Sequence, residues 1–496
     1  MAKILLIYPN RWGRGITPIW VASHSASLKK GGHKVELFDT TFFSQWSVNE
    51  TDYNTENKQY KPSDYNRVIK YNNLDPVKEL NSRIMEFRPD AIFSSALSSH
   101  IHGEGEYVNI EYYNLLLSKI TVPDEVKIIA GGLQVTAGGE EIFKKFDNIQ
   151  YFIRGESEIV LRELAARIDE GEDFNRTYGL LYKKNGEVIE CPRQELISEM
   201  DKIGFYDYSL FSDQSFLRPY NGEILRAVDY EMSRGCLYAC SYCVETVIQK
   251  YYGFQENSRG TIKNHKKYLR NKSSSSICSE ICSLNSDLNI KLLRCQDTNF
   301  LTIERSVLED VAEYFDKSDL DIILYIETRP EGINRKTVEL LKRLKVDGVG
   351  MGIELSNEHF RESNLNRYSS INNIEAAFSL LKEAGIKRTA YNVIGFPDET
   401  EENIQETIEF NRILNPDNIT VAFYSPYQGT EQQIKSYEKG YFQNREKDVD
   451  GQLRTLSEHS LVNSMTLEFY KKYFSTLTRE GLDRIEEYKH EFDLQK

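Results

Sequence analysis

The sequence predicts an α/β protein in which two series of β/α units are followed by a largely helical C-terminal segment. Within residues 1–190, short apolar runs that suit buried strands alternate with helical patterns. A second series of six such runs begins near Ile224, and residues 431–496 are polar with apolar positions at helical spacing. Strands that alternate with helices are typical of parallel sheets covered by helices.

Five apolar runs of the first series predict a doubly wound parallel sheet. They are Lys3–Tyr8, Lys34–Asp39, Ala91–Leu97, Lys127–Ala130 and Tyr151–Arg154. Helical patterns cover Pro18–Lys30 and Ile159–Ile168, and a glycine pair closes the first of these helices. Gly179–Glu190 then predicts a hairpin with Asn185-Gly186 at its turn.

The second series predicts a partial (β/α)6 barrel between residues 224 and 430. Its strands are expected at Val228–Met232, Ile290–Arg294, Leu320–Tyr325, Gly348–Ile353, Arg388–Ile394 and Ile419–Tyr424. Residues 191–223 carry mixed signals and are expected to link the two domains. In β/α barrels the functional loops lie at the C-terminal ends of the strands, so the residues after each run are the candidates for a site.

Charge and composition limit the classes of function. The 496 residues include 62 Lys and Arg against 76 Asp and Glu, a net charge of -14. This acidic balance argues against broad binding to nucleic acid or to anionic membranes. No apolar stretch approaches the roughly 18–20 residues of a membrane span, and the first residues suit a strand better than a signal peptide. We therefore expect a cytoplasmic protein whose thiols stay reduced.

Three cysteines follow the first strand of the predicted barrel. Cys236, Cys240 and Cys243 form a C-x3-C-x2-C pattern. Three thiolates on one loop can hold three irons of a [4Fe–4S] cube and leave the fourth iron open to a ligand. Zinc sites usually use four ligands in paired C-x2–4-C spacing, and no partner pair follows here. Three further cysteines are expected to be buried small hydrophobes rather than ligands of a second cluster: Cys278, Cys282 and Cys295.

With the cysteine loop at a strand end of a six-unit β/α series, the chain resembles the radical S-adenosylmethionine (SAM) superfamily. More narrowly, residues 1–430 resemble the subgroup with an N-terminal cobalamin-binding domain. The resemblance implies a [4Fe–4S] cluster on the three cysteines, with SAM bound at the open iron and cleaved by one electron to a 5′-deoxyadenosyl radical. It also implies a small-molecule substrate and an external electron donor of the flavodoxin or ferredoxin type.

Motifs after the barrel strands resemble the SAM-contacting segments of this family. They are Ser233-Arg234-Gly235, Gln296–Phe300, Gly352-Ile353-Glu354, Val393–Pro397 and Tyr424–Thr430. The resemblance implies SAM contacts at Tyr242, Asp297, Glu327, Glu354, Arg367, Ile394 and Tyr424. A structurally paired carboxylate is the alternative for Asp297, Glu327 and Glu354. Arg367 suits a bidentate pair with the methionyl carboxylate, and a surface arginine is the alternative.

The N-terminal half resembles the cobalamin-binding Rossmann-like fold. Residues 131–136 resemble the family's Gly-Gly-x-His-x-Thr loop, with Gln134 in place of His, and residues 155–158 resemble its Gly-Glu-x-Glu loop. The resemblance implies cobalamin contacts at Gly131, Gly132, Gln134, Thr136, Gly155 and Glu156. The Asp-x-His-x-x-Gly motif that ligates cobalt in other cobalamin domains is absent from the sequence. We expect cobalt without that imidazole, and we interpret His100 and His102 as ordinary loop histidines.

The function that this resemblance implies is a cobalamin-dependent radical SAM methyltransferase. One SAM methylates reduced cobalamin, and the radical from a second removes hydrogen from an unactivated substrate carbon that then takes the methyl group. One alternative is a radical rearrangement, cyclisation or oxidation that uses cobalamin without methyl transfer. Another is a non-catalytic iron–sulfur or cobalamin-binding protein. No motif identifies the substrate or an individual catalytic side chain.

Overall fold

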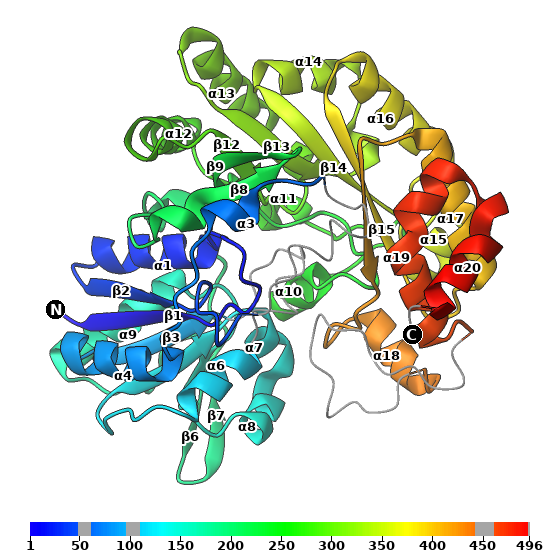
Figure 1. Ribbon diagram of the computed structural model, residues 1–496. Helices are drawn as coiled ribbons and strands as arrows, with labels where there is room; N and C mark the ends of the chain where they lie inside the picture. Colours follow the sequence, from blue (N-terminus) through cyan, green and yellow to red (C-terminus); the bar gives the residue numbers. More distant parts are fainter. Residues whose placement is uncertain (48–60, 96–109, 442–460, 495–496) are drawn as a thin grey trace.

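The computed structural model describes residues 1–47, 61–95, 110–441 and 461–494. Two seven-stranded sheets dominate these residues, and the C-terminal helices pack on the outer side of the second sheet (Figure 1). The predicted α/β fold class is confirmed. No helix within the described ranges is both long and apolar enough to cross a membrane.

The N-terminal sheet has the strand order β2-β1-β3-β4-β5-β6-β7. Its first five strands are parallel, and the last two form the antiparallel hairpin predicted around Asn185-Gly186. The strands are β1 Lys3–Tyr8, β2 Lys34–Asp39, β3 Ala91–Ser95, β4 Lys127–Gly131, β5 Tyr151–Ile153, β6 Leu180–Lys184 and β7 Glu187–Glu190. Crossover helices between parallel strands place the strand ends at one edge, where ligands of such sheets bind.

Alternate residues of β1 supply the cores on the two faces of this sheet. Ile4 and Leu6 pack in a core with helices α1 Ile19–Lys30 and α9 Glu158–Glu170. Leu5 and Ile7 pack in a separate core on the other face. The helices of that face are α4 Pro76–Phe87, α6 Ile110–Leu117, α7 Leu133–Gly138 and α8 Ile142–Lys145. This period of two in a fully buried strand is what a doubly wound sheet requires.

The second sheet is a curled, open half-barrel with the order β16-β15-β14-β13-β12-β9-β8. Its strands are β8 Leu217–Tyr220, β9 Glu223–Tyr230, β12 Leu292–Cys295, β13 Ile323–Thr328, β14 Val346–Glu354, β15 Lys387–Ile394 and β16 Asn418–Phe423. Strands β9 to β16 are parallel, as predicted, and β8 pairs antiparallel with β9. Strand β8 lies in the segment that we expected to link the domains, so that segment also extends the barrel sheet.

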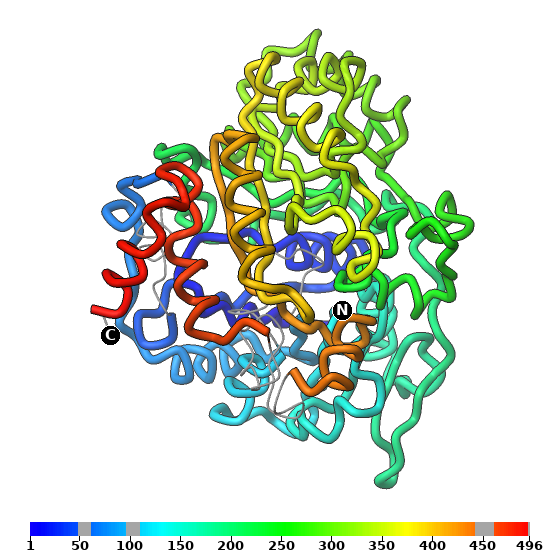
Figure 2. Tube along the Cα trace, turned by 90° about the vertical axis from the view of Figure 1, so that its right-hand side faces the viewer, coloured from blue at the N-terminus to red at the C-terminus, as the bar shows by residue number. Residues whose placement is uncertain are grey.

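Helices follow the strands of the half-barrel along the chain. Those between its strands are α10 Glu245–Tyr251, α11 His265–Tyr268, α12 Ser274–Leu288, α13 Arg305–Lys317, α14 Arg335–Arg343, α15 Glu358–Leu365, α16 Ile371–Glu383 and α17 Glu401–Leu414. The C-terminal helices are α18 Glu431–Glu438, α19 Ser464–Glu480 and α20 Ile485–Leu494. Leu467 and Phe474 of α19 share a buried core with Ile404 and Ile408 of α17. The C-terminal segment therefore packs on the last barrel unit, which the turned view also shows (Figure 2).

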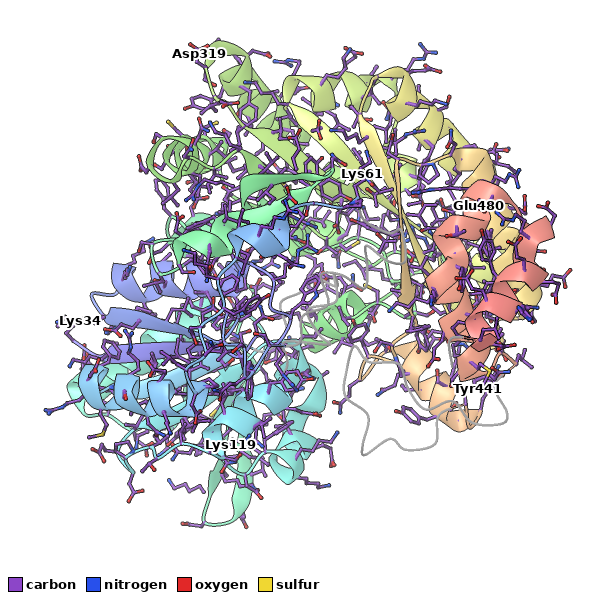
Figure 3. The ribbon with its side chains drawn as sticks, viewed as in Figure 1. Lys34, Lys61, Lys119, Asp319, Tyr441 and Glu480 are labelled. Atoms are coloured by element: carbon purple, nitrogen blue, oxygen red, sulfur yellow. The ribbon has the colours of Figure 1, made fainter. Side chains whose placement is uncertain are left out.

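The two sheets share one continuous core. Buried residues of the connecting segment, among them Ile203 and Tyr206, belong to the same cluster as Leu6 of β1 and Val228 of β9. Charged side chains such as Lys34, Asp319 and Glu480 stand at the periphery of the molecule (Figure 3). The strand ends of the two sheets face a common region, which contains α10 and the cysteine loop (Figure 1).

Candidate functional site

The cysteine loop leaves the barrel after β9 and a two-residue strand β10, Ser233–Arg234, and it ends at α10. Gly235 has φ 97°, and a Cβ there would lie 2.6 Å from the Tyr268 carbonyl oxygen, so only glycine fits at the start of the loop. The Gln249 amide nitrogen donates to the carbonyl oxygens of Cys236 and Tyr238 at 2.9 and 3.0 Å. Backbone and side-chain bonds therefore fix the loop independently of any ligand.

The three thiols have the surroundings that an iron–sulfur cluster needs. Cys236 and Cys240 are buried, Cys243 is partly buried, and all three are free thiols. Burial raises the pKa of Cys236 to about 12 and that of Cys243 well above its usual value. Buried thiols become thiolates when bound cationic iron compensates their charge. Among the described residues, no group of three or more His, Cys, Asp or Glu side chains is placed to bind a single metal ion. A [4Fe–4S] cube does not need such a group, because each cysteine binds a different iron.

An arginine that the sequence did not indicate lies beside this loop. The Arg329 Nη1 is 3.5 Å from the Sγ of Cys240, and the guanidinium lies 3.6 Å from the Tyr238 ring centroid. Arg329 follows β13 and pairs with Glu331 at 2.6 Å. A fixed positive charge at this distance would favour a negatively charged cluster on the loop.

Glu354 and Arg367, two of the expected SAM contacts, lie next to the same loop. Glu354 ends β14 with φ 62°, a left-handed conformation that is strained for a residue with a side chain. The Arg367 Nη1 is 3.6 Å from the Glu354 Oε1, and its Nη2 donates to the Gly352 carbonyl oxygen at 2.5 Å. A Cβ at Gly352 would collide with the Glu354 carboxylate. The Arg367 Nε is buried without a hydrogen-bond partner in the described structure, so the pair has capacity left for an anionic ligand group.

Aromatic side chains wall this site on the side of β15 and β16. The ring centroids of Tyr242 and Phe396 are 5.5 Å apart, and those of Phe396 and Tyr424 are 5.1 Å apart. Burial and the Glu354 charge raise the pKa of Tyr242, which keeps its phenol neutral. The Ile394 side chain instead packs in the core beneath α17 and α19. Tyr242 and Tyr424 thus meet beside the cysteine loop, and Ile394 contributes to the support behind them.

Asp297 and Glu327 occupy different layers of the half-barrel. The Asp297 Oδ1 accepts hydrogen bonds from the Ser233 amide at 2.6 Å and the Ser233 hydroxyl at 2.5 Å. Its Oδ2 is buried without a partner in the described structure, and burial raises its pKa to about 7. Glu327 accepts from the Tyr391 hydroxyl at 3.1 Å inside the barrel. Asp297 therefore holds the start of the cysteine loop, and Glu327 belongs to the barrel interior.

Four of the predicted cobalamin residues lie where β4 turns into α7, at the strand-end edge of the N-terminal sheet. Gly132 has φ 98°, which the turn from β4 into α7 requires. The Gln134 side chain accepts from the amide of Ile110 at 2.9 Å. The Thr136 hydroxyl donates to the Gly132 carbonyl oxygen at 2.8 Å and accepts from the Gly155 amide at 2.9 Å. These residues, with Gly131 at the end of β4, tie the strand-end loops to one another.

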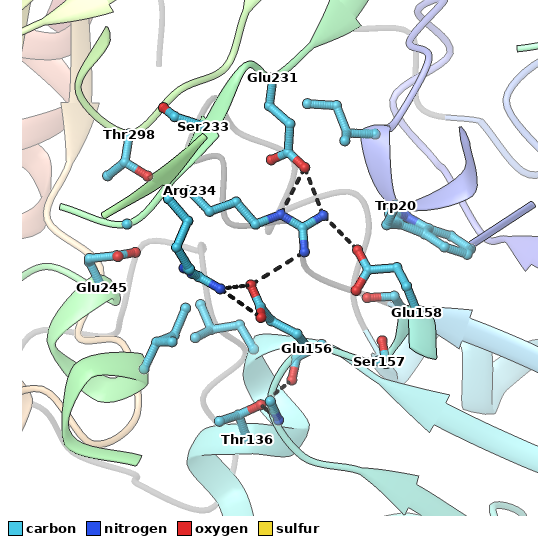
Figure 4. Close-up of a pocket in the computed structure, with 18 of the residues that line it drawn as sticks. Trp20, Thr136, Glu156, Ser157, Glu158, Glu231, Ser233, Arg234, Glu245 and Thr298 are labelled. Atoms are coloured by element: carbon cyan, nitrogen blue, oxygen red, sulfur yellow. Dashed lines mark hydrogen bonds and ion pairs between the residues drawn. The ribbon is translucent and has the colours of Figure 1, made fainter. Parts of the chain in front are cut away.

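The loop after β5 packs directly against the barrel. A Cβ at Gly155 would collide with the Tyr252 hydroxyl, which itself accepts from the Glu156 amide at 2.9 Å. Glu156 accepts two bonds of 2.8 Å from Arg270, on the short strand β11 Arg270–Asn271. Figure 4 shows Glu156 and Glu158 pointing at Arg234 across this interface. Gly155 and Glu156 thus contact the barrel in this structure, and Leu133, next to Gly132, also packs against Val244 and Ile248 of the barrel domain.

A cavity of about 140 Å³ lies between the two domains at this point. It is lined from the N-terminal side by Trp20, Thr136 and Ser157 and from the barrel side by Ser233 and Thr298 (Figure 4). Predicted cobalamin residues from both segments line it, Gly132 and Thr136 after β4 and Gly155 and Glu156 after β5.

Histidines matter at this site because an imidazole could ligate cobalt. His24 is buried in α1, and its Nδ1 and Nε2 lie 2.6 Å from the Trp20 carbonyl oxygen and 2.7 Å from the Ser157 hydroxyl. Burial lowers the pKa of His24. Both ring nitrogens of His24 are therefore engaged within the protein. His100 and His102 lie outside the described residues.

The model of the radical SAM superfamily matches residues 230–410, from the end of β9 into α17. This range contains the cysteine loop, Glu354 and Arg367. Residues 230–410 therefore form a radical SAM domain. Curated relatives extend the likeness into the N-terminal sheet. An uncharacterized methyltransferase of Pyrococcus horikoshii is 25% identical over 70% of this chain and 69% of its own. An anaerobic magnesium-protoporphyrin IX monomethyl ester cyclase of Rubrivivax gelatinosus is 24% identical over 86% of this chain and 68% of its own.

Solved structures match the whole two-domain arrangement. The radical SAM methyltransferase TsrM from Kitasatospora setae, solved with cobalamin and a [4Fe–4S] cluster, matches with a TM-score of 0.64 at 18% identity. The match covers 88% of this chain and 78% of TsrM. At this identity the likeness concerns the fold, and it confirms the expected order of a Rossmann-like sheet, a half-barrel and a C-terminal segment in this radical SAM enzyme.

Two residues of the site had no role assigned from the sequence. Arg329 follows β13 in a stretch without a recognisable motif. Its position after a barrel strand is the one sequence feature that could have indicated a site residue. Arg270 lies on β11, far along the chain from its partner Glu156. Phe396 was part of the Val393–Pro397 motif, but the aromatic wall appears only when Tyr242 and Tyr424 are placed beside it.

Proposed function

We propose that this protein is a cobalamin-dependent radical SAM enzyme that methylates an unactivated carbon of a small-molecule substrate. The cysteine loop is proposed to bind the [4Fe–4S] cluster. The strand-end edge of the N-terminal sheet is proposed to bind the cobalamin. The observation that carries the proposal is that both faces meet at one interface, where Arg234 and Glu158 approach to 2.6 Å. A methyl group and a radical must reach the same carbon, so their sources must share one cavity.

The residues on the barrel side suit SAM. The buried Arg367 has an unpartnered Nε that can donate to the methionyl carboxylate, and Glu354 can accept from the α-amino group. Tyr242, Phe396 and Tyr424 provide an apolar wall for the adenosine. SAM would thereby be held with its sulfonium beside the cluster, the position at which one electron cleaves it. An external flavodoxin- or ferredoxin-like donor and a cytoplasmic setting complete the proposal.

A second candidate is an oxidative cyclisation without methyl transfer. The cyclase of Rubrivivax gelatinosus matches 86% of this chain, more than the methyltransferase of Pyrococcus horikoshii does. In this reaction the radical would also remove hydrogen, and the product would carry no new methyl carbon.

Labelled SAM separates the two candidates. The anaerobically reconstituted, reduced protein is incubated with methyl-labelled SAM and a panel of small molecules, and products are followed by mass spectrometry. Methyl transfer predicts 5′-deoxyadenosine, S-adenosylhomocysteine and label in the product. Product and 5′-deoxyadenosine without label would contradict methyl transfer and support cyclisation or oxidation. No 5′-deoxyadenosine under any condition would contradict both.

A further inference from the structure

Arg234 joins two sequence motifs that were expected to serve different cofactors. It lies two residues before Cys236 and donates from its Nη2 to the Glu158 carboxylate at 2.6 Å. Its Nε donates to Glu231 at 2.8 Å, and its Nη1 lies 3.3 Å from Glu156 (Figure 4). One guanidinium thus contacts carboxylates from the end of β9, the loop after β5 and the start of α9.

Neighbouring groups complete a buried network around this arginine. Arg270, which pairs with Arg234 in the β10–β11 ladder, binds both oxygens of Glu156. The Glu156 Oε2 also accepts from the Ile197 amide at 2.9 Å. The side chains of Arg234, Glu156 and Glu158 expose only 16%, 12% and 5% of their surface. Burial alone would raise the pKa of Glu158, but Arg234 and His24 lower it to about 2.

Buried ion pairs contribute little net stability, because desolvation offsets most of the attraction. A guanidinium fork does impose geometry, since its donors satisfy several carboxylates in only one placement. Here the fork is attached to the cysteine loop, and two of its three carboxylates belong to the N-terminal domain. A shift of the loop relative to the N-terminal sheet would break these bonds.

We propose that Arg234 is a positioning residue that sets the placement of the cysteine loop relative to the strand-end edge of the N-terminal sheet, through Glu156 and Glu158. The Gly155–Glu158 segment thereby helps to dock the two domains, beside the packing of Leu133 in α7 against Val244 and Ile248. Because the placement concerns a cluster and a cobalamin, the inference rests on the proposed function. Arg234 acts through the loop and touches no reacting atom.

Magnetic resonance tests the placement directly. In reduced protein that holds both cofactors, the paramagnetic cluster and cob(II)alamin interact with a strength that depends on their separation. Arg234→Gln should retain both signals and alter their mutual splitting, and Arg234→Lys should lie between Gln and wild type. Arg388→Gln removes a buried arginine paired with Asp417 at 3.0 Å elsewhere in the barrel and should leave the splitting unchanged. Unchanged splitting in Arg234→Gln would overturn the proposal.

A second readout needs no cofactor. Hydrogen exchange in the cofactor-free chain should become about tenfold faster for amides 154–158 in Arg234→Gln, the change expected from losing roughly one charged hydrogen bond across the interface. Arg388→Gln should leave these amides unchanged. Equal exchange in wild type and Arg234→Gln would contradict the positioning role. Absence of any cob(II)alamin signal in wild type would contradict the proposed function instead, and the exchange result would still decide the role of Arg234.

Discussion

The strand-end loops of the two sheets use their polar side chains differently. In the N-terminal sheet, Gln134, Thr136 and Glu156 bond to the protein's own amides and guanidinium groups. In the barrel, Glu354 and Arg367 converge beside the cysteine loop, and Arg367 retains a buried, unpartnered Nε in the described structure. The first set of residues builds a frame, whereas the second keeps hydrogen-bonding capacity for a ligand. Polar motifs that look alike in the sequence therefore have different roles, one structural and one suited to ligand binding.

Replacing a cysteine of the loop has the largest expected effect, the loss of one cofactor. It also tests whether the two cofactors bind to different domains. Cys240→Ala should abolish the cluster absorbance of the anaerobically reconstituted protein and spare the corrin bands, because Cys240 is proposed to ligate iron and lies in the barrel. Absorbance spectra of both proteins with hydroxocobalamin check this. Loss of both chromophores, or of neither, would contradict the division of cofactors between the domains.

Arg367 tests the capacity of the barrel site for a ligand. Arg367→Ala should weaken SAM binding to the cluster-loaded protein by about 10–100-fold, the range expected for losing a charged hydrogen bond to a carboxylate. Calorimetric titration measures the affinity, and Arg388→Gln is the control for loss of a buried arginine. An unchanged Kd in Arg367→Ala would mean that Arg367 only supports the Gly352 carbonyl oxygen.

Arg329 tests the electrostatics of the cysteine loop. Arg329→Gln should lower the reduction potential of the cluster by on the order of tens of millivolts, because a nearby positive charge favours the electron-rich reduced state. Arg329→Lys keeps the charge and should stay close to wild type. A redox titration followed by electron paramagnetic resonance gives the potentials. Equal shifts in both variants would point to geometry rather than charge.

Glu399, which lies behind the aromatic wall, is expected to make the stability of the fold depend on pH. Its carboxylate accepts from the amides of Gly395 and Phe396, and burial raises its pKa to about 8. The folded state thus binds more protons than the unfolded state between about pH 4.5 and pH 8. Its contribution to stability is full below pH 4.5 and is lost as pH rises to 8. Glu399→Gln should flatten this decline in urea-unfolding curves, and an identical slope in both proteins would refute it.

Gln134 gives the smallest expected effect and tests the N-terminal frame. Gln134→Ala should lower the free energy of unfolding of the cobalamin-free protein by about 1 kcal/mol, because the Ile110 amide loses its acceptor. Urea unfolding without cobalamin measures the change. No loss of stability would indicate that this amide side chain is free to serve the ligand.

Strand positions were predictable because buried apolar runs and flanking glycines mark them locally. The strands Lys3–Tyr8 and Lys34–Asp39 have the predicted bounds, and β14 and β15 differ by only a residue or two at their ends. Side-chain partners were not predictable in this way. The Gly155–Glu158 motif gave no sign that Arg234 and Arg270 would bind its carboxylates, since those partners lie on another domain and one sequence carries no pairing information.

The proposed function requires one chain to hold a cluster on the barrel side and a cobalamin on the side of the N-terminal sheet. The most direct measurement is the corrin and iron content of anaerobically cluster-loaded wild-type protein after incubation with hydroxocobalamin and gel filtration. We expect one corrin and one cluster to be retained per chain. A cluster-loaded chain that emerges without corrin would contradict it.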